Sequence, residues 1–106
     1  MDFKELMETV AKNWPFDEKT YLELKGVNEE TKLRFAVKHV LLHLQKSLGQ
    51  MAEICESADH KGTLDPLDLE LHASKFAVNT VRLLGLIGVD AERLDRFVEE
   101  WVRSKV

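Results

Sequence analysis

The stretch NEETKLRFAVKHVLLHLQKSLGQMAEICESADHKG, residues 28–62, decides the fold of this chain. Asn28 is a favourable N-cap, and Gly62 follows the last periodic residue as a stop signal. Between them, apolar residues recur every three or four positions, which predicts one long helix over roughly residues 28–60. Its expected core stripe is Leu33, Val37, Val40, Leu44, Leu48, Met51, Cys55 and Ala58. Cys55 is therefore expected to be a buried core residue.

Shorter helices are expected on both sides of this one. Asp2 can cap a helix through Asn13, and Asp17 can cap a short helix through Leu24. After Gly62, the pair Asp65–Pro66 should begin a helix that ends at Gly88, and Asp90 should cap the last helix. No alternating run predicts a strand. The fold class is therefore all-α, in a single domain over residues 1–106, with the two longest helices forming an antiparallel hairpin.

Composition excludes several classes of protein. Among the 106 residues, 44% are hydrophobic and 32% are charged, which is typical of a globular domain rather than a disordered chain. The net charge is −4 and no basic cluster is present, so no nucleic-acid partner is expected. No apolar run approaches the ~20 residues that span a membrane. The charged N-terminus does not look like a signal peptide, and Cys55 has no cysteine to pair with, so a cytoplasmic location is expected.

Polar residues interrupt the centre of the predicted hairpin. Folding the chain back at Gly62 places residue 50 beside roughly 75 and residue 43 beside roughly 82. The long helix carries His43, Ser47 and Gln50 on one face, and the following helix carries His72, Lys75, Asn79 and Arg82. We therefore expect two polar stripes to face each other or to border the same groove.

Two segments resemble the MazG-type family of helical nucleoside triphosphate pyrophosphohydrolases. The family's first core helix reads Leu-Leu-His-Leu-x-Glu-Glu-x-Gly-Glu-Leu-x-Glu, and residues 41–53 here read LLHLQKSLGQMAE. The family's second motif, Glu-x-x-Asp before Arg-Leu-Ala-x-x-Leu-Gly-Ile-Asp, resembles HASKFAVNTVRLLGLIGVD at residues 72–90. The resemblance covers roughly residues 33–90. It implies a MazG-like helical bundle built on the long hairpin and assembled with a second subunit.

The departures from the family pattern fall on its metal-binding carboxylates. Non-acidic residues replace five of them, namely Lys46, Ser47, Gln50, His72 and Lys75, and only Glu53 matches. Mg²⁺ requires several hard oxygen ligands, which lysine and histidine do not supply. We therefore expect that metal-dependent pyrophosphohydrolase activity has been lost, with no catalytic residue, metal ligand or cofactor retained. An active enzyme with a rearranged Mg²⁺ site is the alternative.

A lost metal site leaves room for a different ligand. Lys46 and Lys75 could replace the charge of the metal, and Gln50 and Asn79 could add hydrogen bonds to a nucleotide or phosphate. With Glu53, these residues form the candidate ligand-binding set of a binding or assembly module. A simpler interpretation is favoured for the charges themselves: Lys75 pairs with Glu53 across the hairpin, and Lys46 extends into solvent.

Other constellations are less informative. His39 and His43 have the spacing of a zinc-binding pair, but His72 should lie ~15 Å from them along the helix axis. We therefore expect the two histidines to be packed at a helix interface or partly exposed. A weak cation site formed by Glu53, Glu56 and Asp68 near the turn is a minor alternative. The Trp14–Pro15–Phe16 corner is expected to belong to the core.

Self-association is expected from surplus apolar surface. The long helix adds Phe35, Ala36, Leu41 and Ile54 outside its main stripe, and the last helix offers Trp101 and Val102. These residues predict a homodimer or tetramer that buries well over ~1,000 Å². Gly49 costs about 1 kcal/mol relative to alanine within a helix, so we expect another helix to pack closely against its Cα.

Overall fold

The computed structural model describes all residues 1–106, and its regular elements are all helices, with no strand, as predicted. In chain order the elements are α1 (Phe3–Asn13), η1 (Leu22–Leu24), α2 (Glu29–Lys61), η2 (Pro66–Leu69), α3 (Glu70–Leu86) and α4 (Ala91–Lys105). No helix is both long enough and apolar enough to cross a membrane.

Local capping explains where most helices begin and end. The side chains of Asp2, Asn28 and Asp90 each accept a 2.8 Å hydrogen bond from the backbone N–H three residues later. Gly62 ends α2 in the left-handed conformation, with φ of 81°. These predicted boundaries are confirmed. Each depends on only a few neighbouring residues, and this is why the sequence alone could predict it.

Two predicted helix starts differ in the structure. Asp17 does accept a 2.9 Å hydrogen bond from the Thr20 N–H, but only Leu22–Leu24 follows as a short 3₁₀ helix. Asp65 accepts from Leu67 N at 3.0 Å, yet a 3₁₀ turn over Pro66–Leu69 comes before α3 begins at Glu70. Both aspartates therefore form the expected local hydrogen bond but start tight turns rather than α-helices.

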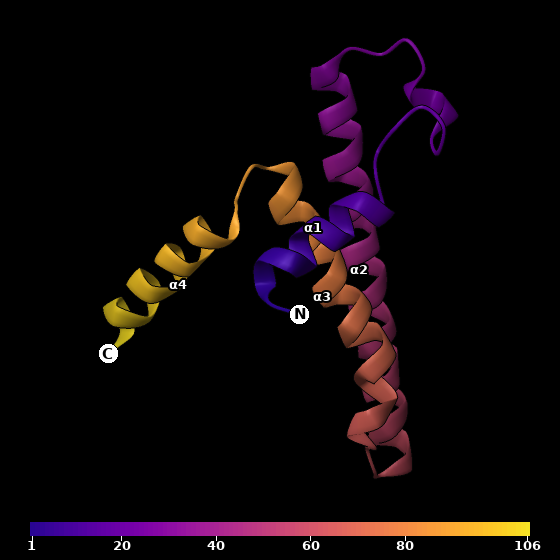
Figure 1. Ribbon diagram of the computed structural model, residues 1–106. Coiled ribbons are helices and arrows are strands. Elements are labelled where there is room, and N and C mark those ends of the chain that lie inside the picture. The colour runs from indigo at the N-terminus through magenta and orange to yellow at the C-terminus, as the bar shows by residue number, and fades with distance from the viewer.

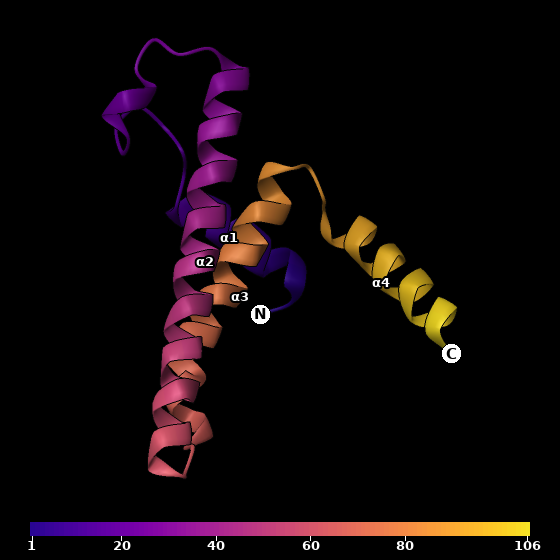
Figure 2. The same cartoon turned by 180° about the vertical axis from the view of Figure 1, so that it is seen from behind.

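The predicted antiparallel hairpin of α2 and α3 is confirmed. The two helices lie side by side along most of α3, joined by the turn at Gly62, and α1 crosses α3 near its C-terminal half (Figure 1; Figure 2). Ala36, Val40 and Ser47 are buried on α2, and Val81 is buried on α3. Small side chains at this contact allow the two helix backbones to approach closely.

The face of α2 that packs against α3 matches the predicted stripe only in part, because Val40 is fully buried as predicted but other residues of the stripe are not. Leu33 and Leu48 of that stripe are 43% and 58% exposed, and Cys55 is exposed rather than in the core. We call the row Leu33, Val37, Leu41, Leu44, Leu48, Met51 and Cys55 the outer face of α2. The inner face, with Ala36 and Val40, is rotated from it by about one residue position. Because apolar residues occur on both faces of α2, the apolar period of the sequence did not distinguish the inner face from the outer face.

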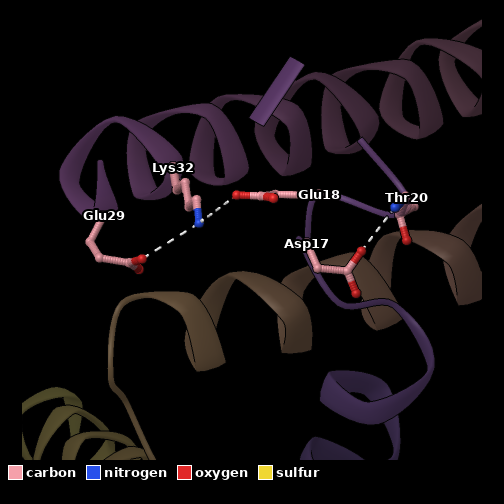
Figure 3. Close-up of polar contacts among 5 residues, drawn as sticks. All are labelled: Asp17, Glu18, Thr20, Glu29 and Lys32. Atoms are coloured by element: carbon pink, nitrogen blue, oxygen red, sulfur yellow. Dashed lines mark hydrogen bonds and ion pairs between the residues drawn. The ribbon is translucent and has the colours of Figure 1, made fainter. Parts of the chain in front are cut away.

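The segment between α1 and α2 folds against the N-terminal end of α2. Lys32 on α2 lies 3.6 Å from the Glu18 carboxylate and 3.6 Å from that of Glu29 (Figure 3). Figure 3 also shows Asp17 accepting from the Thr20 backbone N–H, the interaction that chiefly lowers the pKa of Asp17. These contacts hold the segment that carries the aromatic corner near α2.

The single chain buries little of its apolar surface. Only six of 106 residues are buried, and none of them is in α4, which projects away from the hairpin (Figure 1). The Cα radius of gyration is 17.0 Å, whereas a compact domain of this size has about 13 Å. The accessible surface is 8204 Å², against about 6,100 Å² for a compact monomer of the same mass. The fold of one chain therefore leaves its core incomplete.

Gly49 has open space beside its Cα, contrary to the prediction of a close helix contact. A Cβ built on this exposed residue would meet no atom within 4 Å. Within one chain, the predicted close packing is therefore wrong, and nothing in the chain offsets the helix propensity that glycine loses.

Candidate functional site

A groove of about 520 Å³ lies between α2, α3 and the segment that follows α1. Its lining residues are Trp14, Tyr21, His39, His43, Leu71, Ser74, Lys75, Val78, Asn79 and Arg82. We call it the histidine groove. His43 and Arg82 line it together, which agrees with the hairpin register predicted from the turn.

Two histidines meet at the α2 side of this groove. The Nε2 atoms of His39 and His43 lie 3.0 Å apart, and the Tyr21 hydroxyl lies 3.3 Å from His39 Nε2. A hydrogen bond between two Nε2 atoms requires one to carry a proton and the other to accept it. The pair is partly buried at a helix interface, as the sequence predicted, and its geometry favours at least one neutral ring.

An aromatic cluster surrounds His39 on its other side. The His39 ring stacks on Phe35 with centroids 5.8 Å apart, and its centroid lies 5.1 Å from that of Tyr21 and 5.6 Å from that of Phe16. Phe16 is therefore part of a packed corner, as expected. Trp14 is not in the core, because it is 51% exposed at the edge of the groove.

Arg82 connects α3 to this corner. Its guanidinium lies 4.5 Å from the centroid of the Phe16 ring, and its Nη2 donates a 3.2 Å hydrogen bond to the Trp14 carbonyl oxygen. Its Nε is buried without a hydrogen-bond partner. Arg82 is thus held by packing while part of its hydrogen-bonding capacity stays unused.

The environment of His39 favours its neutral form. Burial lowers the pKa of His39 most, followed by the charges of His43 and Arg82, and Glu23 opposes them. Protonation would place a second positive charge close to Arg82 in a partly buried site. The groove therefore concentrates positive potential beside a histidine that resists becoming charged.

A second, more open groove of about 800 Å³ lies near the hairpin turn. It is lined by Gln50, Glu53, Ile54, Ser57, Ala58, Lys61, Thr63, Leu64, Asp65, Asp68 and His72. We call it the turn groove. His72 Nδ1 is buried there without a hydrogen-bond partner. Glu53 and His72 line it together, again in agreement with the predicted register.

The five predicted ligand-binding residues do not share one groove. Gln50 and Glu53 line the turn groove, whereas Lys75 and Asn79 line the histidine groove. Lys46 is exposed and lines neither, so its expected extension into solvent is confirmed. The predicted Lys75–Glu53 ion pair is wrong, because the ion pairs of the chain involve Lys32 and Arg103 instead.

No group of three or more His, Cys, Asp or Glu side chains lies close enough to share a metal ion. Of the three acids considered for a weak cation site, Glu53 and Asp68 line the turn groove and Glu56 does not.

Sequence reasoning missed Trp14 and Tyr21 as groove residues, whereas Arg82 was expected there. Arg82 was visible as part of the polar stripe on α3, but Trp14 and Tyr21 lie in an irregular segment with no periodic signal. Comparison of the chain with known protein families, with curated proteins and with solved structures finds no match.

Proposed function

We propose that this chain is a MazG-like, non-catalytic assembly module that forms a homodimer through the outer face of α2. The observation that carries the proposal is the exposure of that face. Leu33, Leu41 and Leu48 are 43%, 45% and 58% exposed on one side of the longest helix. A row of large apolar side chains of this length is typical of a protein–protein interface.

The surplus surface matches the size of a stable dimer interface. The accessible surface exceeds that of a compact monomer of this mass by about 2,000 Å² per chain. Obligate homodimers bury about 2,000–5,000 Å² in total. A second copy laid along α2 would therefore complete the core that one chain lacks, and the row repeats at the three-and-four spacing that helices use to pack lengthwise.

Charges beside the outer face favour an antiparallel pair of α2 helices. Arg34 and Lys38 flank the face in its first half, whereas Glu56 and Asp59 flank it in its second half, and all four are exposed. An antiparallel arrangement centred between Leu44 and Leu48 brings each basic pair beside the acidic pair of the partner subunit. A parallel arrangement would leave the basic and acidic pairs at different levels along the axis and would form none of these ion pairs.

Loss of pyrophosphohydrolase activity is supported by the chemistry of the residues at the family's carboxylate positions. Gln50, His72 and Lys75 provide no anionic oxygen, and the acid Glu53 lies in an open groove beside Lys61. A phosphate-release assay with several nucleoside triphosphates and Mg²⁺ or Mn²⁺ should detect no turnover. Robust turnover that disappears in Glu53→Gln would contradict the non-catalytic proposal and favour an active enzyme with a rearranged site.

Assembly is tested by light scattering coupled to size exclusion over a dilution series. The parent chain should have the mass of a dimer at micromolar concentration, and Leu48→Glu should have that of a monomer. Leu22→Glu is the matched control, because Leu22 is 79% exposed but lies in η1 and is not part of the outer face of α2. A monomeric parent, or equal dissociation by both variants, would contradict the proposal, and a stable tetramer would show that α4 adds a second interface.

A further inference from the structure

We propose that the histidine groove binds a small aromatic anion, with its ring against Trp14 and Tyr21 and its anionic group beside Lys75, Arg82 and the histidine pair. This inference goes beyond the assembly proposal and involves a different surface. The groove volume of about 520 Å³ falls within the range of small-molecule sites.

The charge of the groove favours an anion. Lys75 and Arg82 line it, His39 and His43 add two further groups that can carry positive charge, and no acidic side chain lines it. Low-dielectric walls concentrate such a potential toward the ligand. The turn groove differs, because it is lined by Glu53 together with two aspartates. The positive charge is therefore local to the histidine groove, although the net charge of the chain is −4.

The groove also offers unused hydrogen-bond donors. Arg82 uses Nη2 for the Trp14 carbonyl and retains further N–H groups of its guanidinium. The Lys75 ammonium is in no ion pair, and Asn79 Nδ2 uses one proton for the Lys75 carbonyl oxygen at 3.0 Å. A carboxylate or phosphoryl group accepts several such bonds at once.

An aromatic ring is favoured by the opposite wall. Trp14 is 51% exposed although it borders a packed aromatic cluster, and Tyr21 presents the edge of that cluster to the groove. A planar ring stacked there would cover apolar area that one chain leaves open. A cation is disfavoured, because the converging histidines lack a third ligand and stand beside Arg82 and Lys75.

Anion binding should be linked to protonation of His39. His43 and Arg82 oppose the charge of His39, Glu23 favours it, Tyr21 hydrogen-bonds the ring, and Lys75 lies across the groove. A bound anion would offset the repulsion from His43 and Arg82, so binding should take up a proton. Affinity should therefore be higher near pH 6 than near pH 8.

The two tryptophans provide a direct test by nitrogen–proton NMR of the full chain. Phenyl phosphate and benzoate are the probes, and Trp101→Phe assigns the Trp14 indole signal. Trp14 lines the groove, whereas Trp101 lies on α4 outside it. Titration should shift the Trp14 indole signal to saturation and leave that of Trp101 in place. The tighter of the two probes identifies the anionic group, and phenol or inorganic phosphate alone should bind about tenfold more weakly than phenyl phosphate.

Matched lysine variants locate the anionic end. Lys75→Gln should weaken phenyl phosphate binding by about fivefold to tenfold, whereas Lys46→Gln should leave it unchanged, because exposed Lys46 lies outside the groove. In His39→Gln, benzoate, which stays ionised over this pH range, should differ less in affinity between the two pH values than in the parent, although His43 still lines the groove. Absence of a saturable Trp14 shift, an equal shift of Trp101, or an equal loss of affinity in both lysine variants would overturn the proposal.

Discussion

The inner and outer faces of α2 carry apolar residues at the same helical period, yet the chain covers only the inner one. Val40 is fully buried, whereas Leu48, about two turns along the helix, is 58% exposed. The inner face carries Ala36 and Ser47, whose small side chains let α3 approach, and the outer face carries leucines. Residue size and the position of the turn, rather than apolar period, therefore decide which face α3 covers and which remains exposed.

The sharpest way to separate the two faces is to place the same charge on each. Val40→Asp should lower the free energy of unfolding by about 3 kcal/mol or more, because an unpaired carboxylate would be buried against α3. Leu48→Asp should leave the isolated chain folded and weaken only its self-association. Urea denaturation at low and high protein concentration distinguishes the two outcomes.

Equal destabilisation of Val40→Asp and Leu48→Asp at a concentration where the parent is monomeric would remove the distinction between the faces. Leu22→Asp is the control for adding a charge at an exposed leucine, and it should change the unfolding free energy little.

Gly49→Ala examines the exposed side of α2 next to the outer face. Alanine should raise the free energy of unfolding by about 1 kcal/mol, because it has the higher helix propensity and its methyl group meets open space. Thermal melts of parent and variant measure the difference. A lower melting temperature that depends on protein concentration would show that a second copy packs directly on Gly49.

A pH titration examines the inner side, where His39 is partly buried. Because the folded chain lowers the pKa of His39 below its ordinary value, the unfolded chain takes up a proton first as pH falls. This contribution to stability is complete above about pH 6.5 and is lost as pH falls through the folded pKa of His39. Partial exposure keeps the effect smaller than those of the preceding variants.

Melting temperatures between about pH 7.5 and about pH 5.5 should therefore fall more for the parent than for His39→Gln. Lys46→Gln serves as a comparison, because it changes an exposed polar residue of α2 without changing a histidine. An equal decrease in the parent and in His39→Gln would assign the pH dependence to other groups.

The elements that the sequence predicted well are those fixed by neighbouring residues. Asp2, Asn28 and Asp90 cap helices, Gly62 turns the chain, and the antiparallel hairpin follows from these signals. The register was also correct where the structure tests it, because His43 meets Arg82 in one groove and Glu53 meets His72 in the other.

The candidate site was harder to predict because it depends on which way side chains turn. Gln50 and Lys46 lie one turn apart on α2, yet only Gln50 lines either groove. The aromatic wall comes from Trp14 and Tyr21 in a segment without regular structure, where no periodic rule applies. The predicted burial of Cys55 was wrong for a related reason. The apolar character of a residue does not show whether another element of the chain covers it.

The smallest expected effect concerns the direction in which two outer faces meet. Lys38 and Glu56 are both exposed and stand about five helical turns apart on the same side of α2. In an antiparallel dimer, Lys38 faces Glu56 of the partner subunit twice. Lys38→Glu and Glu56→Lys should each weaken the dimer by about twofold to fivefold, as expected for two exposed ion pairs of roughly 0.2–0.5 kcal/mol each.

The double variant, Lys38→Glu with Glu56→Lys, should restore the parent affinity, because each pair is reversed but remains complementary. Sedimentation equilibrium at low ionic strength measures the dissociation constants of the parent, the two single variants and the double variant, and added salt should bring the four values together by screening the charges. In a parallel dimer, Lys38 and Glu56 of the partner subunit would lie about 27 Å apart along the axis, so this ion pair would not form. The single variants would then not weaken the dimer through it, and the double variant would restore nothing.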